Sequence, residues 1–245
     1  MIELHDVYFT PRGQRILEGI SLRIAGGELF AIMGASGAGK STILRLMNGL
    51  IKPDRGSIMV DGEDITGFSE QQLAPIRRKL GMVFQSAALF DSLTVAENVG
   101  FAWRKAKISR DEYLQRVKQT LEIVGLENVE HRMPAELSGG MRKRVGLARA
   151  IAMNPEALLY DEPTAGLDPV TSNRILDLII DLRNRLAVTS VMVTHDLQAA
   201  FAAADRVALL YDGRLAFIGT VDEMRNTTDP LIRRFVTGGQ VMDAG

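Results

Sequence analysis

The chain has 245 residues, of which 46% are hydrophobic and 24% are charged, which is ordinary for a globular protein. Its 29 basic and 30 acidic residues leave a net charge of −1, which argues against a protein that coats nucleic acid. The absence of cysteine excludes disulfides and thiolate metal sites, and no run approaches the roughly 20 apolar residues that a membrane-spanning helix needs. The lack of cysteine suits a reducing compartment, and the opening residues carry charge where a secretory signal would be apolar. If the protein serves a membrane, we expect it to do so from outside the bilayer.

Short apolar runs alternate with helical patterns in the first third of the chain, which predicts an α/β fold. Two antiparallel strands are expected near the start, and a turn and a buried strand follow them. The buried strand leads directly into a glycine-rich loop and a helix. In chain order, the expected elements are strands at 2–9, 15–24 and 29–33, a helix at 40–50, and a strand entering a turn at 57–62.

The stretch 86–153 has helical periodicity, clearest at 111–124, and is predicted to be a mostly helical insert. The pattern of alternating strands and helices resumes after it, so the insert interrupts one core made of 1–85 and 154–225. We therefore expect a single domain over 1–245, with an extension at 226–245. The later elements are expected as strands at 157–160 and 189–194, a helix at 170–186 and a hairpin at 206–219.

The segment 34–42 reads GASGAGKST and fits the phosphate-binding pattern G-x-x-x-x-G-K-[ST] between a strand and a helix. Its glycines let backbone N–H groups face phosphate oxygens. Lys40 is expected to bridge the β- and γ-phosphates of a nucleotide, and Ser41 to bind Mg²⁺ through its hydroxyl. The residues expected around the phosphates are Gly34, Ala35, Ser36, Gly37, Ala38, Gly39, Lys40, Ser41 and Thr42.

Four further polar residues follow predicted strands, where α/β proteins bind their ligands. Asp161 ends the apolar run ALLYD and is a candidate for holding Mg²⁺, and the adjacent Glu162 is our candidate for activating water. Gln85 is expected to end a strand at 81–85 and to reach the metal or the water. His195 is expected to contact the γ-phosphate and the attacking water as a neutral imidazole.

A second possible anion site lies at 136–145, which reads ELSGGMRKRV. Ser138, Gly139 and Gly140 precede a helical pattern, as at a helix N-terminus that binds an anion through its backbone, but no lysine takes part. The basic residues Arg142 and Lys143 are expected on a solvated helix face. The residues expected to pack inward from this helix are Val145, Ala148 and Ile151.

Together these motifs resemble the nucleotide-binding subunit of ABC transporters, in the expected order and over nearly the whole chain. The resemblance implies a P-loop NTPase core of the ABC ATPase type, with an antiparallel β subdomain and a helical insert. It also makes 137–141 the signature motif, His195 the switch histidine and Asp168 a dimer-communication residue in the loop 165–168.

In this family the signature loop serves the nucleotide of a second subunit. The resemblance therefore implies a homodimer that clamps two ATP-Mg²⁺, in which Ser138, Gly139 and Gly140 face the γ-phosphate held by the partner copy. Phe9 falls where the family stacks an aromatic ring on adenine, and Tyr8 is the alternative register. The family works with separate transmembrane permeases, which implies a location at the cytoplasmic face of the inner (plasma) membrane.

The signature has Met141 where glutamine is commoner, and it resembles the subgroup that works with MCE-type lipid-binding proteins, the MlaF- and Mkl-like ATPases. The segments 84–99 and 229–239 resemble the same subgroup. This likeness implies a phospholipid or another hydrophobic cargo and an MCE-type partner. Two interpretations of Leu89 and Phe90 are equally good: they lie beside a groove that accepts the permease's coupling helix, or they belong to the ordinary core of the insert.

Three other functions stay open at this stage. The same ATPase could drive an importer of a polar solute, and the permease that accompanies it would decide. A non-transport ABC ATPase usually carries a tandem cassette or a long coiled-coil insert, and neither is visible. A P-loop kinase would have no use for the signature motif or for Asp168.

Overall fold

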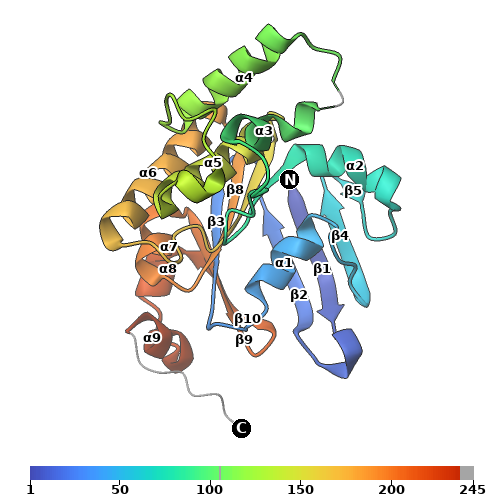
Figure 1. Ribbon diagram of the computed structural model, residues 1–245. Coiled ribbons are helices and arrows are strands. Elements are labelled where there is room, and N and C mark those ends of the chain that lie inside the picture. The colour runs from blue at the N-terminus through green and yellow to red at the C-terminus, as the bar shows by residue number, and fades with distance from the viewer. Residues whose placement is uncertain (105, 238–245) are drawn as a thin grey trace. The chain divides into compact units, whose positions relative to one another are not determined.

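The computed structural model describes residues 1–104 and 106–237 (Figure 1), and these residues form two compact units. Unit 1 comprises residues 1–73 and the chain from 191 onward, and unit 2 comprises residues 74–190. Each unit is described by itself. The predicted Gly238 and Gly239 of the extension lie outside the described residues.

The first sheet of unit 1 is antiparallel, with the strand order β2-β1-β4-β5. Its register is fixed by apolar pairs, since Ile2 lies opposite Ile24 on one side and Val60 on the other, and all three are buried. The predicted strands at 2–9 and 15–24 are confirmed, the second beginning slightly later. The bounds are β1 (Ile2–Phe9), β2 (Leu17–Ile24), β4 (Arg55–Val60) and β5 (Glu63–Asp64), with a 3-10 turn at Pro11–Gly13.

A second sheet in unit 1 contains β3 (Leu29–Met33), which was predicted at these residues. All five of its residues are buried, as expected for a central strand. It pairs in parallel with β9, and β9 forms the predicted antiparallel hairpin with β10. The remaining bounds are β8 (Thr189–Thr194), which begins in unit 2 and ends in unit 1, β9 (Arg206–Tyr211) and β10 (Arg214–Thr220).

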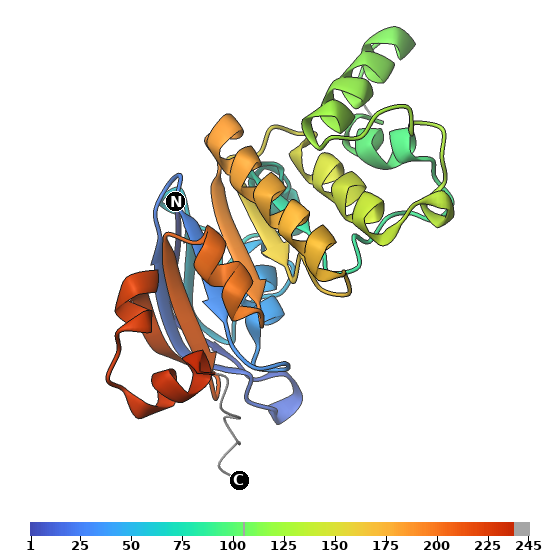
Figure 2. The same ribbon diagram turned by 90° about the vertical axis from the view of Figure 1, so that its left-hand side faces the viewer.

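The helices of unit 1 include α1, which follows the glycine-rich loop, and α7, which packs on β3. The helix predicted at 40–50 ends earlier than expected, because Gly49 adopts a left-handed conformation with φ of 61°. Helix α8 contacts both strands of the β9–β10 hairpin and also α9 (Figure 2). The bounds are α1 (Lys40–Met47), α7 (Leu197–Ala203), α8 (Val221–Arg225) and α9 (Pro230–Val236).

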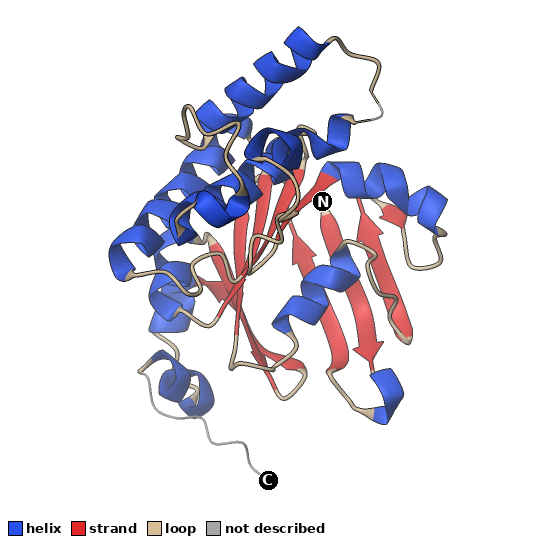
Figure 3. Cartoon of the chain, in the orientation of Figure 1, coloured by secondary structure: helices blue, strands red, loops and turns tan. Residues whose placement is uncertain are grey.

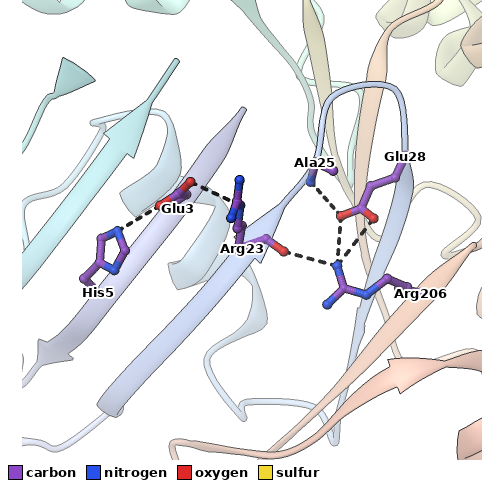
Figure 4. A network of polar contacts seen from close by, with 6 residues as sticks. All are labelled: Glu3, His5, Arg23, Ala25, Glu28 and Arg206. Carbon is purple, nitrogen blue, oxygen red and sulfur yellow. Dashed lines mark hydrogen bonds and ion pairs between the residues drawn. The ribbon is translucent and has the colours of Figure 1, made fainter. Parts of the chain in front are cut away.

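A polar network joins the two sheets of unit 1 (Figure 4). Glu28 accepts from the Ala25 N–H at 2.9 Å and from the Arg206 guanidinium, which also donates to the Arg23 carbonyl of β2. The Arg23 side chain pairs with Glu3 of β1 at 3.3 Å. The Arg23–Glu3 pair is largely exposed and so contributes little to stability, whereas the Glu28–Arg206 pair is part-buried.

Unit 2 contains the parallel strands β6 (Leu80–Val83) and β7 (Ala157–Asp161), with Gly81 opposite Leu158. Strand β6 ends at Val83, so the expectation that Gln85 ends this strand is wrong; Gln85 instead lies in the turn that follows. The strand predicted at 157–160 is confirmed and extends to Asp161, which places the carboxylate at the strand end.

Between β6 and β7, the described residues form helices and loops but no strand (Figure 3). Side chains cap three of these helices, because Thr94, Ser109 and Ser138 each accept from a backbone N–H of the first helical turn, and Asp168 caps a helix after β7 in the same way. The helices between the two strands are α3 (Val95–Val99), α4 (Arg110–Ile123) and α5 (Gly139–Ile151), with 3-10 turns at Gly100–Trp103 and Pro134–Glu136. Helix α2 (Glu70–Lys79) precedes β6 and crosses the division between the units, and α6 (Pro169–Leu186) follows β7.

Within the part of the chain that the structure describes, none of the helices combines the length and the apolar character that crossing a bilayer requires.

Candidate functional site

The glycine-rich loop of unit 1 connects β3 to α1, as predicted. Lys40 opens α1 and is only 6% exposed, and its ammonium donates to the carbonyls of Gly34 and Ala35, each at 3.0 Å. Ser41 and Thr42 follow in the first turn and are half-buried. The loop therefore holds its lysine against its own backbone, beside the helix N-terminus that favours anions.

Gly34 is required by a close approach of two backbone segments. A Cβ at this position would collide with the carbonyl oxygen of Leu210, in the β9–β10 hairpin. Ala35, Ser36 and Gly37 after it are exposed, so their backbone is open to a ligand.

A surface pocket of about 340 Å³ adjoins this loop. It is lined by residues 14–16, 35–38 and 210–213. The N–H of Ile16 donates to the carbonyl of Phe9 at 3.0 Å, which brings Phe9 next to the pocket wall. Tyr8 instead has the Arg55 guanidinium 4.9 Å from its ring centre. The structure thus places the Phe9 backbone beside the pocket wall and the Tyr8 ring near Arg55.

His195 directly follows β8 and is exposed. The next residue, Asp196, caps α7 by accepting from the N–H groups of Gln198 and Ala199. His195 thus lies between a strand end and a capped helix, and its predicted place at the end of the strand is confirmed.

In unit 2, Asp161 and Glu162 lie together at the end of β7, and they are 5% and 8% exposed. Glu162 has φ of 46°, in the left-handed region that residues with a Cβ seldom adopt. Its backbone therefore turns away from the strand direction, and the two neighbouring carboxylates are not presented as a regular strand would present them.

Gln85 and Glu162 are joined through a residue that the sequence did not single out for this role. The ammonium of Lys143, on α5, donates to the carbonyl of Gln85 at 2.5 Å and to that of Glu162 at 3.3 Å. Lys143 is 6% exposed, so its expected place on a solvated face is wrong. Burial lowers the pKa of the Lys143 ammonium, while the negative charges of Glu162 and Asp161 oppose that shift.

Other expectations for α5 are confirmed. Arg142 is exposed, and Val145, Ala148 and Ile151 are buried. Arg149, two turns after Lys143, donates to the carbonyls of Ala87 and Ala88.

The signature residues form the start of α5. The Ser138 hydroxyl caps the helix by accepting from the Met141 N–H at 3.3 Å. A Cβ on Gly140 would lie 2.8 Å from the Thr171 methyl carbon, and one on Gly139 would lie 3.3 Å from Leu167. Only glycine leaves this helix N-terminus so close to the start of α6.

Asp168 caps α6, accepting from the N–H of Thr171 at 3.0 Å and from its hydroxyl at 2.6 Å. These bonds from Thr171 lower the pKa of the Asp168 carboxyl. The signature and the loop 165–168 therefore share a neighbour in Thr171, which the sequence did not indicate because Thr171 belongs to neither motif.

Three curated relatives are similar to this chain over most of its length. The first is the protein TRIGALACTOSYLDIACYLGLYCEROL 3 of Arabidopsis thaliana, at 43% identity over 97% of this chain and 74% of the relative. The second is the methionine import ATP-binding protein MetN of Carboxydothermus hydrogenoformans, at 42% over 96% and 71%. The third is the intermembrane phospholipid transport system ATP-binding protein MlaF of Escherichia coli, at 39% over 97% and 89%.

Among solved structures, a dimeric ATP-binding cassette in a post-hydrolysis state with bound ADP and phosphate matches 90% of this chain and 99% of its own, with a TM-score of 0.83 and 35% identity. The likeness supports the predicted α/β fold of the ABC ATPase type. The family model described as ABC transporter matches residues 17–165. The chain therefore belongs to the ABC transporter family, as a subunit that binds and hydrolyses ATP.

Proposed function

We propose that two copies of this chain clamp two ATP molecules head to tail, and that closing and reopening of the clamp drives a separate transmembrane permease. The observation that carries the proposal is the presence in one chain of two different features that suit an anion, a loop with the buried Lys40 and a helix N-terminus capped by Ser138 without a lysine. In this arrangement the second feature completes the site of the partner copy. ATP then favours the closed dimer because it binds both copies at once.

The residues expected to hold Mg²⁺ are Ser41, Gln85 and Asp161, which offer hydroxyl, amide and carboxylate oxygens. Such hard oxygen donors suit Mg²⁺, and Asp161 is a buried carboxylate at a strand end, so the donor set fits the ion. An ion held there would neutralise negative charge on the β- and γ-phosphate oxygens.

In the hydrolytic step, Glu162 orients the attacking water and accepts its proton. General-base assistance of this kind contributes about 10²–10⁴-fold to a rate. Lys40, His195 and, from the partner copy, Ser138 with the Gly139 and Gly140 amides face the charge on the γ-phosphate. Loss of that phosphate removes the bridge between the copies, and Asp168, at the start of α6, is proposed to communicate this change between them.

The permease contact is proposed on the aromatic pair Phe90 and Phe101, in the helical part of unit 2. Their rings stack at 4.6 Å between centres although they are 43% and 38% exposed. Arg149 and Arg104 border the pair, with guanidinium carbons 5.8 and 5.4 Å from the ring centres. Exposed aromatic residues rimmed by arginine are typical of protein interfaces, and Leu89 beside them is half-buried. Membrane contact through this surface would place the subunit at the cytoplasmic face of the inner (plasma) membrane.

The cargo is proposed to be a phospholipid or another hydrophobic molecule, delivered with an MCE-type lipid-binding partner. Met141 in the signature supports this, as do the likeness to the phospholipid-system protein of E. coli and to the A. thaliana relative that is named after a lipid. The alternative is an importer of a polar solute, which the similarity to methionine import proteins favours.

Glu162→Gln tests the hydrolytic role. It keeps the size of the side chain and removes the base, so we expect retained ATP binding, a longer-lived ATP-dependent dimer by light scattering, and turnover reduced at least about 100-fold. Near-normal phosphate release from this variant would remove Glu162 from the proposed role.

The cargo is tested by purifying the chain with its permease and identifying the bound lipids by mass spectrometry. We expect phospholipid above the level carried by an unrelated membrane protein from the same detergent extract. Background lipid levels, together with ATPase stimulation by a polar solute such as methionine, would favour the importer instead.

A further inference from the structure

Helix α5 carries a stripe of three residues, one turn apart, that faces the segment 85–88. Lys143 donates to the Gln85 carbonyl, and Arg149 donates to the carbonyls of Ala87 and Ala88 at 2.8 and 2.7 Å. Gly146 lies between them in sequence, and a Cβ there would lie only 3.1 Å from the Ala87 Cβ. The segment is thus held by two cations and packed closely against a helical glycine.

Lys143 also reaches beyond this segment. Its ammonium donates to the Glu162 carbonyl at 3.3 Å while it holds Gln85, and the side chain is 6% exposed. An ammonium has three donors and can serve both carbonyls at once. One buried side chain therefore ties the backbone of the turn after β6 to the backbone after β7.

Glu162, at one end of this tie, and the two alanines just after Gln85, at the other, have unfavourable backbone conformations. Glu162 has φ of 46°, and Ala87 and Ala88 have φ of 62° and 46°. Residues with a Cβ occupy this region only where surrounding contacts hold them there. The hydrogen bonds from Lys143 and Arg149 are such contacts.

We infer that Lys143 is a positioning residue for hydrolysis, which sets the backbone of Glu162 relative to that of Gln85. The inference rests on the proposed function in one respect, since it takes Glu162 as the base. A shift of the Gln85 turn would then move Glu162 through a single side chain. Lys143 contacts the protein's own carbonyls, so its loss should impair the chemical step more than the binding of ATP.

The test uses Lys143→Met in the full-length chain, which keeps the length of the side chain and removes its donors. The matched control is Lys118→Met on α4, where the lysine is 68% exposed and lies 4.0 Å from Glu122. We expect kcat for ATP to fall at least about tenfold, as a misplaced base loses part of its 10²–10⁴-fold contribution. KM and ATP-dependent dimerisation should stay close to those of the wild type, and the control should match it throughout.

Two further variants separate positioning from mere stability. Lys143→Arg retains donors for both carbonyls, so its kcat should be well above that of Lys143→Met. Lys143→Gln has a single amide group, so its kcat should lie between those of Lys143→Met and Lys143→Arg. If Lys143→Met does not fold, Lys143→Gln carries the test. Folded variants whose kcat stays within about twofold of wild type, with only a lower Tm, would overturn the inference.

A double-mutant cycle with Glu162→Gln identifies the residue through which Lys143 acts. In that background Lys143→Met should lower kcat no further, because the base is already absent. Fully additive losses would show that Lys143 acts elsewhere, which also overturns the inference. Normal hydrolysis by Glu162→Gln alone would instead contradict the proposed function, so the two failures are distinguishable.

Discussion

Two buried lysines, one in each unit, make the same kind of hydrogen bonds but to different parts of the chain. Lys40 and Lys143 are both 6% exposed, and each ammonium donates to two backbone carbonyls. Lys40 bonds to its own loop, five and six residues before it, whereas Lys143 bonds to residues 58 positions before it and 19 positions after it.

This difference shows which of the two arrangements a short sequence motif can encode and which depends on the whole fold. Lys40 and its loop form a self-contained structure that one sequence motif encodes, and in the proposed function this structure holds the phosphates. Lys143 joins two segments that a whole subdomain brings together, so its effect depends on the fold. We therefore assign Lys40 to binding phosphate and Lys143 to positioning the base.

The largest effect is expected for Lys40→Ala. Losing the cation that faces the phosphates should weaken ATP binding strongly and reduce phosphate release at least about 100-fold, by comparison with the loss of other charge-stabilising donors. Equilibrium binding of a fluorescent ATP analogue, measured beside Lys143→Met, checks this. Tight ATP binding by Lys40→Ala would break the comparison, because both lysines would then act only on hydrolysis.

A smaller effect is expected at the strand end beside the pocket. Phe9→Ala removes a ring whose stacking on a base is worth about 0.5–1.5 kcal/mol, so KM for ATP should rise about two- to tenfold with little change in kcat. Tyr8→Ala is the control, because its ring lies against Arg55. A larger rise in KM for Tyr8→Ala than for Phe9→Ala would reverse the choice between the two rings.

The smallest effect on turnover is expected for Arg149→Met, which tests whether Lys143 alone, among the residues that hold the segment 85–88, positions the base. Arg149 holds Ala87 and Ala88 by donating to their carbonyls, whereas Lys143 donates to the carbonyl of Glu162. Losing these charge-assisted bonds should lower the free energy of unfolding by about 1.5–3 kcal/mol, with a Tm several degrees lower, and kcat should fall less than in Lys143→Met. Calorimetry and ATPase assays on the same samples measure the stability and kcat. If Arg149→Met lost as much kcat as Lys143→Met, the whole stripe of α5, rather than Lys143 alone, would position the base.

The strand and helix pattern of the fold was largely predictable, because it follows from local periodicity. Strands β3 and β8 were predicted with their observed bounds, and Asp161 was correctly expected at the end of a buried strand. Gln85 was misplaced because the apolar run continues through Phe84, while the strand ends at Val83. Apolar residues in a turn carry no signal that the sheet has ended.

The burial of Lys143 was missed for a different reason. Helical periodicity correctly identified Val145, Ala148 and Ile151 as one inward face, and a basic residue off that face is ordinarily solvated. Helix α5 has a second contacted face, which only the folded segment 85–88 reveals. A glycine at 146, within a helix and three residues from a cation on each side, was the available signal for a close approach.

The central claim, that each ATP is held by two copies of the chain, is tested most directly by mixing two disabled copies. Lys40→Ala disables the phosphate loop, and Ser138→Asp places a like charge against the γ-phosphate while keeping a residue that caps α5 well. We expect each copy alone to be inactive and the mixture to regain ATPase activity, because one composite site in the mixed dimer contains only wild-type residues. A mixture no more active than its parents, or a monomer that hydrolyses ATP at the full rate, would contradict the account.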